Sequence, residues 1–187
     1  MERPKSPNAL NDGVLFSALE MIHCGAEILN GRVSFVAIFE PQTENNLGIT
    51  SLFAGVEQLL KFRLQQTHWS LVFADVNKAT VQAYHSGDFV SVSFSELVKR
   101  IKNISHIALS NEDVAAFETL GRVRNRGMHY NSDAHNEDLA PLYSRVLSAA
   151  IDFTSQHVQS TSFGSTERNR LENLRRDLSK YKDFLKD

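Results

Sequence analysis

Apolar residues recur at helical spacing along most of the chain. A first stripe spans residues 15–29, begins after Asn11–Asp12, which suit an N-cap, and ends at Asn30–Gly31, a plausible helix stop. A stronger and broader stripe covers residues 49–64, where Glu57 and Lys61 add a favourable i,i+4 pair. This pattern predicts two long helices in the first third of the chain.

Capping signals mark two further helix starts. Ser93 and Glu96 have capping-box spacing ahead of apolar positions 97–104, and Ser110 with Asp113 precedes the stripe that runs into an arginine-rich segment. A later stripe over residues 142–157 predicts another helix.

Several segments carry weaker signals. Residues 33–39 fit either a short strand or a further buried helical turn, and residues 41–48 are polar enough to predict a loop. The helix from residue 49 is expected to continue through 68–73, whereas 75–88 is mixed and 89–94 alternates like a short extended piece.

The last stripe predicts a C-terminal helix. Its apolar positions are spaced by three and four residues, as in a coiled-coil seam: Leu171, Leu174, Leu178, Tyr181 and Leu185. The stripe is short, so packing on the rest of the chain is preferred over a dimer zipper. We therefore expect an all-α protein with one helical domain at 1–160 and a C-terminal helix at 161–187, packing on that domain or on a partner.

Composition narrows the function classes. The chain has 187 residues, 42% of them hydrophobic, and a formal net charge of −2, which excludes nucleic-acid binding driven by overall charge. Any RNA contact must use a local basic patch. The single cysteine, Cys24, excludes a disulfide framework and a multi-cysteine zinc site. His23 and Cys24 are adjacent, but the sequence shows no further ligands that would complete a metal site with them. We expect no metal, no cofactor, no membrane contact and a cytoplasmic location.

The chemically informative segment runs from Gly121 to Tyr130 and holds three arginines within five positions, followed by His129. At about 100° per residue, Arg124 falls on the apolar face of its helix, and Arg122 and Arg126 fall toward solvent. An arginine on an apolar face needs a partner or a cleft. Two explanations stay open at this point: an ion pair with Glu57, or a functional role.

Arg124-Asn125-x-x-x-His129 resembles the R-(polar)-x-x-x-H signature of the HEPN superfamily. The segments 56–64 and 68–73 are also similar to bacterial HEPN-like proteins, and the resemblance extends from about residue 49 to residue 130. One departure concerns Tyr130, since related toxins carry a modifiable tyrosine one position later, where Asn131 stands here. Regulation through a modified tyrosine is therefore not expected.

The resemblance implies a bundle of four to five core helices that dimerises, with the motifs of two copies forming one ribonuclease site. It implies Arg124, Asn125 and His129 as catalytic residues, with Arg122, Arg126 and Tyr130 as RNA contacts and Glu57 as a structural or site-supporting residue. Toxins and phage-defence effectors are the expected setting. RNA, with tRNA as one candidate, and an antitoxin or other regulatory protein are the expected partners.

The side-chain chemistry suits this activity. Histidine transfers protons near neutral pH, and arginine offers a fork of donors to phosphate oxygens. The asparagine side chain can orient either the phosphate or the histidine. Two alternatives remain: a non-catalytic HEPN module that dimerises or binds a protein, and a structural helical protein with a chance match to the motif.

Overall fold

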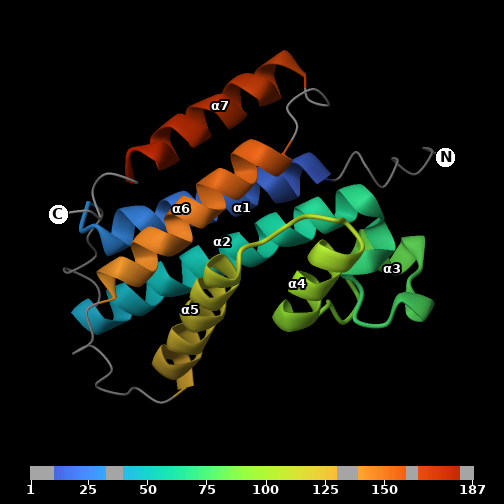
Figure 1. Ribbon diagram of the computed structural model, residues 1–187, viewed down its shortest axis with the longest axis horizontal. Coiled ribbons are helices and arrows are strands. Elements are labelled where there is room, and N and C mark those ends of the chain that lie inside the picture. Colours follow the sequence, from blue (N-terminus) through green and yellow to red (C-terminus); the bar gives the residue numbers. More distant parts are fainter. Residues whose placement is uncertain (1–10, 33–39, 130–138, 159–163, 182–187) are drawn as a thin grey trace.

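The computed structural model describes residues 11–32, 40–129, 139–158 and 164–181. Within these ranges the chain is all-helical, and its only extended pairing is an isolated bridge between Phe73 and Ser91. The helices, drawn in Figure 1, are α1 (Asn11–Leu29), α2 (Pro41–Thr67), α3 (Val81–Ser86), α4 (Phe94–Asn103), α5 (Asn111–His129), α6 (Ala140–His157) and α7 (Ser165–Ser179), with 3₁₀ turns η2 (Trp69–Val72) and η3 (Val76–Lys78). The prediction of an all-α fold is confirmed for the described residues.

The α2 helix begins earlier than the sequence pattern predicts. The loop expected over residues 41–48 is wrong, because Pro41 starts a helix that continues to Thr67. Proline is tolerated in the first helical turn, where backbone N–H groups have no intrahelical acceptor. Gly48, which suggests a loop in the sequence alone, is buried against the side chains of Leu29 and Ile28 of α1. Tertiary packing thus stabilises a polar, glycine-containing segment as helix.

The α1 and α2 helices run antiparallel in close contact. A Cβ atom added at Gly25 would lie 2.7 Å from the backbone nitrogen of Leu52, and one added at Gly55 would lie 2.7 Å from the carbonyl oxygen of Ala18. Glycine at these positions allows the two backbones to approach one another. The closely packed α1 and α2 helices form the central pair of the molecule.

After α2 the chain forms short 3₁₀ turns rather than a longer helix. The prediction that α2 continues through 68–73 is corrected, since the helix ends at Thr67 and the next residues form η2. The Arg100 guanidinium of α4 donates to the carbonyl oxygens of Leu71, Phe73 and Ala74, at 2.7, 2.6 and 3.1 Å. These three bonds hold residues 71–74 against α4. The N-cap of α4 is Ser93, as the capping-box spacing predicts.

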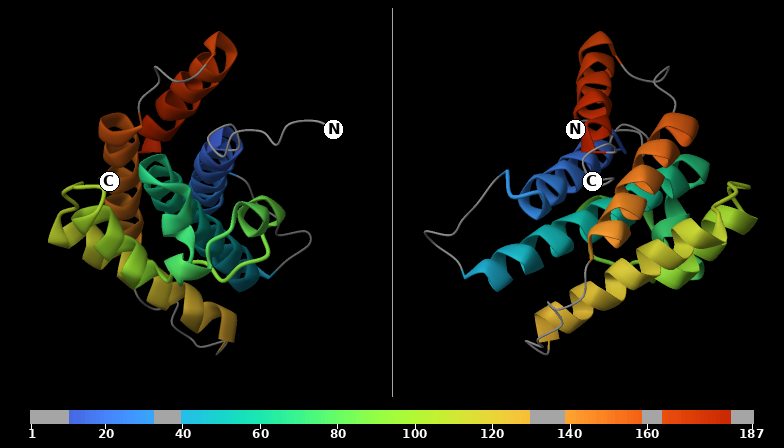
Figure 2. Two further views of the ribbon diagram at one scale, coloured as in Figure 1. Left: turned by 90° about the vertical axis from the view of Figure 1, so that its right-hand side faces the viewer. Right: turned by 60° about the vertical axis from the view of Figure 1, so that its left-hand side comes forward.

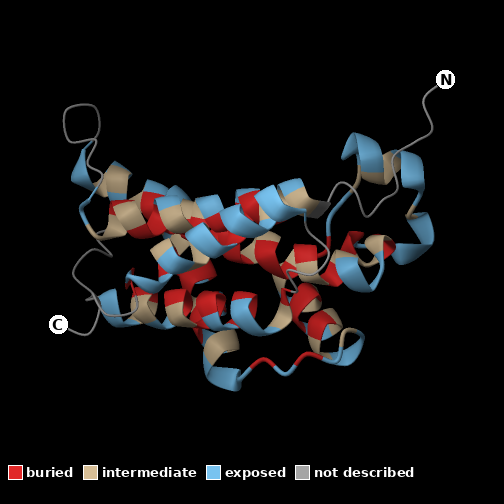
Figure 3. Ribbon diagram, turned by 90° about the horizontal axis from the view of Figure 1, so that it is seen from above, coloured by how far each residue is buried: buried red, intermediate tan, exposed pale blue. Residues whose placement is uncertain are grey.

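The remaining helices cover α1 and α2. In Figures 1 and 2, α5 and α6 pack beside α2, and α7 lies over α1 and α6. The side chains of Leu171, Leu178 and Tyr181 are buried in the same apolar core as α1 and α2. Figure 3 shows the buried residues gathered where the helices face one another. None of the described helices is both long and apolar enough to cross a membrane.

Candidate functional site

The α5 helix starts at a side-chain cap and carries the arginine-rich segment. The Ser110 hydroxyl accepts from the Asp113 backbone N–H at 3.0 Å and donates to the Asp113 carboxylate at 2.6 Å, as their spacing predicts. Glycine is a poor helix former. The helix nevertheless continues through Gly127 to His129.

A continuous helix fixes how the motif positions are arranged around the axis. Arg122, Asn125 and Arg126 form one exposed stripe, which we call the arginine stripe. Position 129 follows Asn125 by four residues, so its Cα lies on the same side of the axis as the arginine stripe. Position 124 lies about 140° around the axis from position 129 at about 100° per residue. The side chain of His129, and all of Tyr130, lie outside the described residues.

Arg124 lies on the side of α5 that faces α2. Its side chain is half-buried, and its guanidinium carbon lies 4.7 Å from the centre of the Phe53 ring. Its Nε atom is buried and has no hydrogen-bond acceptor among the described residues. The ring therefore supplies a cation–π contact where a carboxylate would otherwise be expected.

Glu57 does not serve as the partner of Arg124. Its carboxylate accepts from the Lys61 ammonium group at 2.7 Å, and Lys61 also donates to the Ser91 hydroxyl at 3.0 Å. Glu57 lies one helical turn beyond Phe53, which is about 6 Å further along α2. The i,i+4 pair predicted from the sequence is confirmed, whereas the ion pair with Arg124 that the sequence allowed is not formed.

Two glycines allow α5 to approach α2 closely beside the motif. A Cβ atom at Gly121 would lie 2.8 Å from the Phe53 ring, and one at Gly127 would lie 2.3 Å from the Oδ1 atom of Asn46. The Asn46 amide also donates to the Gly127 carbonyl oxygen at 3.4 Å. The N-terminal half of α2 thereby contacts both ends of the segment that holds Arg124.

The end of α5 is locally basic although the whole chain is slightly acidic. Residues 119–129 include three arginines and no acidic residue. Positive side chains are favourable near a helix C-terminus because the last carbonyl groups carry partial negative charge. The Arg122 guanidinium donates to the Thr119 hydroxyl at 2.7 Å, which holds it along the helix surface. This local patch could contact phosphate groups despite the net charge of −2.

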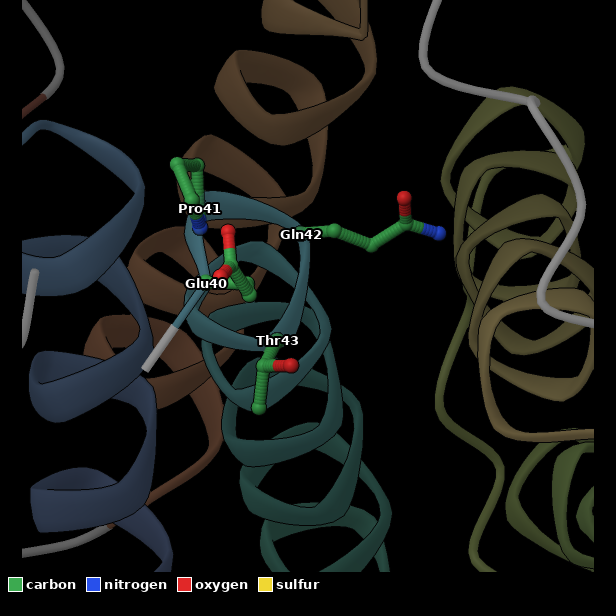
Figure 4. Close-up of a pocket in the computed structure, with 4 residues that line it drawn as sticks. All are labelled: Glu40, Pro41, Gln42 and Thr43. Carbon is green, nitrogen blue, oxygen red and sulfur yellow. The ribbon is translucent and has the colours of Figure 1, made fainter. Parts of the chain in front are cut away.

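An open hollow lies at the start of α2, one turn before Asn46. It has a volume of about 500 Å³ and is lined by Glu40, Pro41, Gln42 and Thr43. Figure 4 shows the Gln42 side chain extending away from those of Glu40 and Pro41. Among the described residues, no three His, Cys, Asp or Glu side chains are grouped so that they could hold a metal ion.

Sequence reasoning missed Phe53 and Asn46 as neighbours of the motif. Phe53 belongs to a predicted core stripe and carries no sign of an interaction with an arginine. Asn46 falls in the segment predicted as a loop, and its contact with Gly127 spans 81 positions.

Comparisons with protein-family models, curated proteins and solved structures gave no match.

Proposed function

We propose that this protein is a metal-independent endoribonuclease of the HEPN type, with its site at the C-terminal end of α5. The observation that carries the proposal is the exposed arginine stripe on a helix that continues to His129. This places two cationic side chains, an amide and the backbone of a histidine within two helical turns. The match of Arg124, Asn125 and His129 to the HEPN motif supplies the reaction class.

In the proposed reaction, the ribose 2′-hydroxyl attacks the adjacent phosphorus. The O2′–P bond forms and the P–O5′ bond breaks, leaving a 2′,3′-cyclic phosphate and a 5′-hydroxyl. His129 moves a proton at the reacting oxygens, as a general base for the 2′-hydroxyl or a general acid for O5′. Arg124 is the motif arginine, and with Arg122 and Arg126 it offsets the charge of the phosphate, which Asn125 orients. Tyr130 remains a proposed RNA contact.

A homodimer would bring a second copy of the motif to the same site. One His129 would then act as the general base and the other as the general acid. The RNA substrate would be single-stranded or structured, with tRNA as one candidate. A cytoplasmic role as a toxin or phage-defence effector, controlled by an antitoxin or another regulatory protein, completes the proposal.

Cleavage in the presence of EDTA tests this function. We expect the purified protein to cut tRNA or structured RNA in EDTA and to leave 2′,3′-cyclic phosphate ends. The His129→Ala variant should lose cleavage, and His85→Ala, an exposed histidine on α3, should retain it. Dependence on an added divalent metal, or full activity in His129→Ala, would contradict the proposal.

The second candidate is a non-catalytic HEPN module that binds a partner protein. The observation in its favour is the separation of about 140° between positions 124 and 129 on one helix. In that arrangement Arg124 packs on Phe53 and does not share a face with His129. Failure to cleave any RNA at high protein concentration, with a stable assembly retained, would favour this candidate.

A further inference from the structure

We propose that Asn46 of α2 is a positioning residue for the last turn of α5, and that Gly127 is the complementary half of this contact. The inference rests on the proposed function, because it concerns how the chain places His129. Asn46 and Gly127 lie far apart in the sequence and meet where α2 contacts the last described turn of α5.

The contact gives the last described turn of α5 a hydrogen bond to a neighbouring helix. Carbonyl groups near a helix end commonly take donors from outside the helix. His129 is the last residue of α5 that the structure describes, and the Gly127 carbonyl lies in this final turn. The Asn46 amide donates to it at 3.4 Å, a long hydrogen bond that crosses from one helix to the other.

The contact also explains why glycine occupies a helical position. Glycine is a poor helix former, and alanine would stabilise the same turn in isolation. Here an alanine Cβ would lie 2.3 Å from the Asn46 Oδ1 atom, so the Asn46 side chain would have to turn aside and give up its contact with α5. The asparagine side chain thus fills the space that the missing side chain of Gly127 leaves open.

The location of the contact makes it a device for positioning. The ends of helices fray more readily than their middles. Asn125, Arg126 and Met128 in the last turn are exposed, and Gly127 is the half-buried residue among them. Holding the Gly127 carbonyl therefore fixes the backbone two residues before His129.

Amide exchange and kinetics of single variants test the proposal. Asn46→Ala removes the contact, and Asn46→Asp keeps the shape while turning the donor into a carboxylate that faces a carbonyl oxygen. We expect both to speed amide hydrogen exchange at residues 127–129 and to shift the NMR titration of His129. Because a misplacement of about 1 Å can cost about 100-fold in rate, we expect kcat to fall by about 10- to 100-fold with KM nearly unchanged. Asn45→Ala, at the exposed neighbouring position, should change none of these.

A double variant separates positioning from general damage. Gly127→Ala should push the Asn46 side chain aside and speed exchange in the last turn to about the extent that Asn46→Ala does. Gly127→Ala combined with Asn46→Ala should speed exchange no further, because both changes remove the same contact. Normal exchange and an unchanged His129 titration in both Asn46 variants, or effects that simply add in the double variant, would overturn the proposal. If the wild-type protein cleaves no RNA, the proposed function fails, while exchange and titration still decide the role of Asn46.

Discussion

Arg124 shows how a charged side chain can occupy the apolar face of a helix with no opposing charge beside it in the described part of the chain. Its guanidinium lies over the Phe53 ring, and its aliphatic stem is half-buried between α2 and α5. A guanidinium loses little by lying on an aromatic face, because it is weakly hydrated and planar. The contact keeps the charge near the surface and fixes the direction of the side chain.

Replacing Arg124 with methionine should separate its charge from its packing. Methionine keeps an unbranched stem on Phe53, so we expect Arg124→Met to cost about 1 kcal/mol or less, the range of a half-exposed cation–π contact. The larger loss of about 3–5 kcal/mol, expected when an ion-pair partner is stranded, should not occur because Glu57 pairs with Lys61. RNA cleavage should nevertheless fall sharply.

A urea titration beside a cleavage assay provides the measurement. Lys99→Met on α4, which removes an exposed positive charge outside the motif, serves as a control with cleavage retained. Retained cleavage in Arg124→Met would assign Arg124 a purely structural role. A loss of stability above about 3 kcal/mol would point to a buried charge partner instead.

At the level of single residues, the sequence predicts the side of a helix on which a residue lies better than it predicts the residue that it contacts. The helical period correctly places Arg124 inward and Arg122 and Arg126 outward, because facing depends only on local spacing. The ring that receives Arg124 lies on another helix, 71 positions earlier, and no local pattern connects the two. The half-buried arginine could be predicted, but its aromatic partner could not.

At the level of elements, the α1–α2 pair depends on glycine. The backbone atoms that a Cβ at Gly55 would meet are the Ala18 carbonyl oxygen at 2.7 Å and the Ile22 nitrogen at 2.8 Å. Backbone atoms in the middle of a packed helix cannot move aside as the end of a flexible side chain can. The helices would have to separate to admit even one methyl group.

Gly55→Ala should therefore destabilise the protein although alanine is the better helix former. We expect a loss of about 1–3 kcal/mol from overpacking. Gly13→Ala is the matched control, because Gly13 is an exposed glycine of α1 with no atom within 4 Å of an added Cβ. It should stabilise the protein by about 0.5 kcal/mol. Thermal unfolding of both variants measures the difference, and equal midpoints would contradict the close approach.

The same glycines limit what the sequence can reveal about element boundaries. Capping residues such as Ser93 and Ser110 act locally, and both helix starts are predicted correctly. Gly48 and its polar neighbours suggest a loop, because the contact of Gly48 with α1 depends on tertiary structure. Local signals determine where these two helices start, whereas packing determines how far α2 extends.

At the level of the whole molecule, two exposed apolar residues adjoin the Asn46–Gly127 contact in the sequence. Leu47 and Met128 are the sequence neighbours of Asn46 and Gly127, and both are exposed, at 39% and 58%. Methionine is enriched in protein interfaces relative to the rest of the surface. Exposed apolar side chains of this kind are what the proposed homodimer, in which two motifs share one site, would bury.

Met128→Lys should weaken that dimer and reduce cleavage together. Placing a lysine from each copy in one interface introduces buried like charges, which oppose association. Val81→Lys, at an exposed apolar position on α3, should leave the dimer intact. Light scattering at micromolar concentration measures the assembly. A monomeric wild-type protein with full cleavage activity would contradict the shared site.

The all-α class could be predicted from the sequence because most helices carry their own apolar stripe. The way these stripes combine could not be predicted. The short stripe of α7 favours packing on the rest of the chain over a zipper, but it does not identify the helices that bury Leu171 and Leu178. Their burial against α1 and α6 is a property of the assembled core.

The antiparallel pairing of α1 with α2 has a consequence for synthesis on the ribosome. Both helices precede α5 in the chain, and their contacts join residues nearer in sequence than the contacts of α2 with α5, which favours earlier formation. The α2 surface formed by Phe53 and Asn46 is therefore available before α5, with Arg124 and Gly127, emerges. The nascent α5 would dock onto a surface that is already folded, and its basic end would spend little time unprotected.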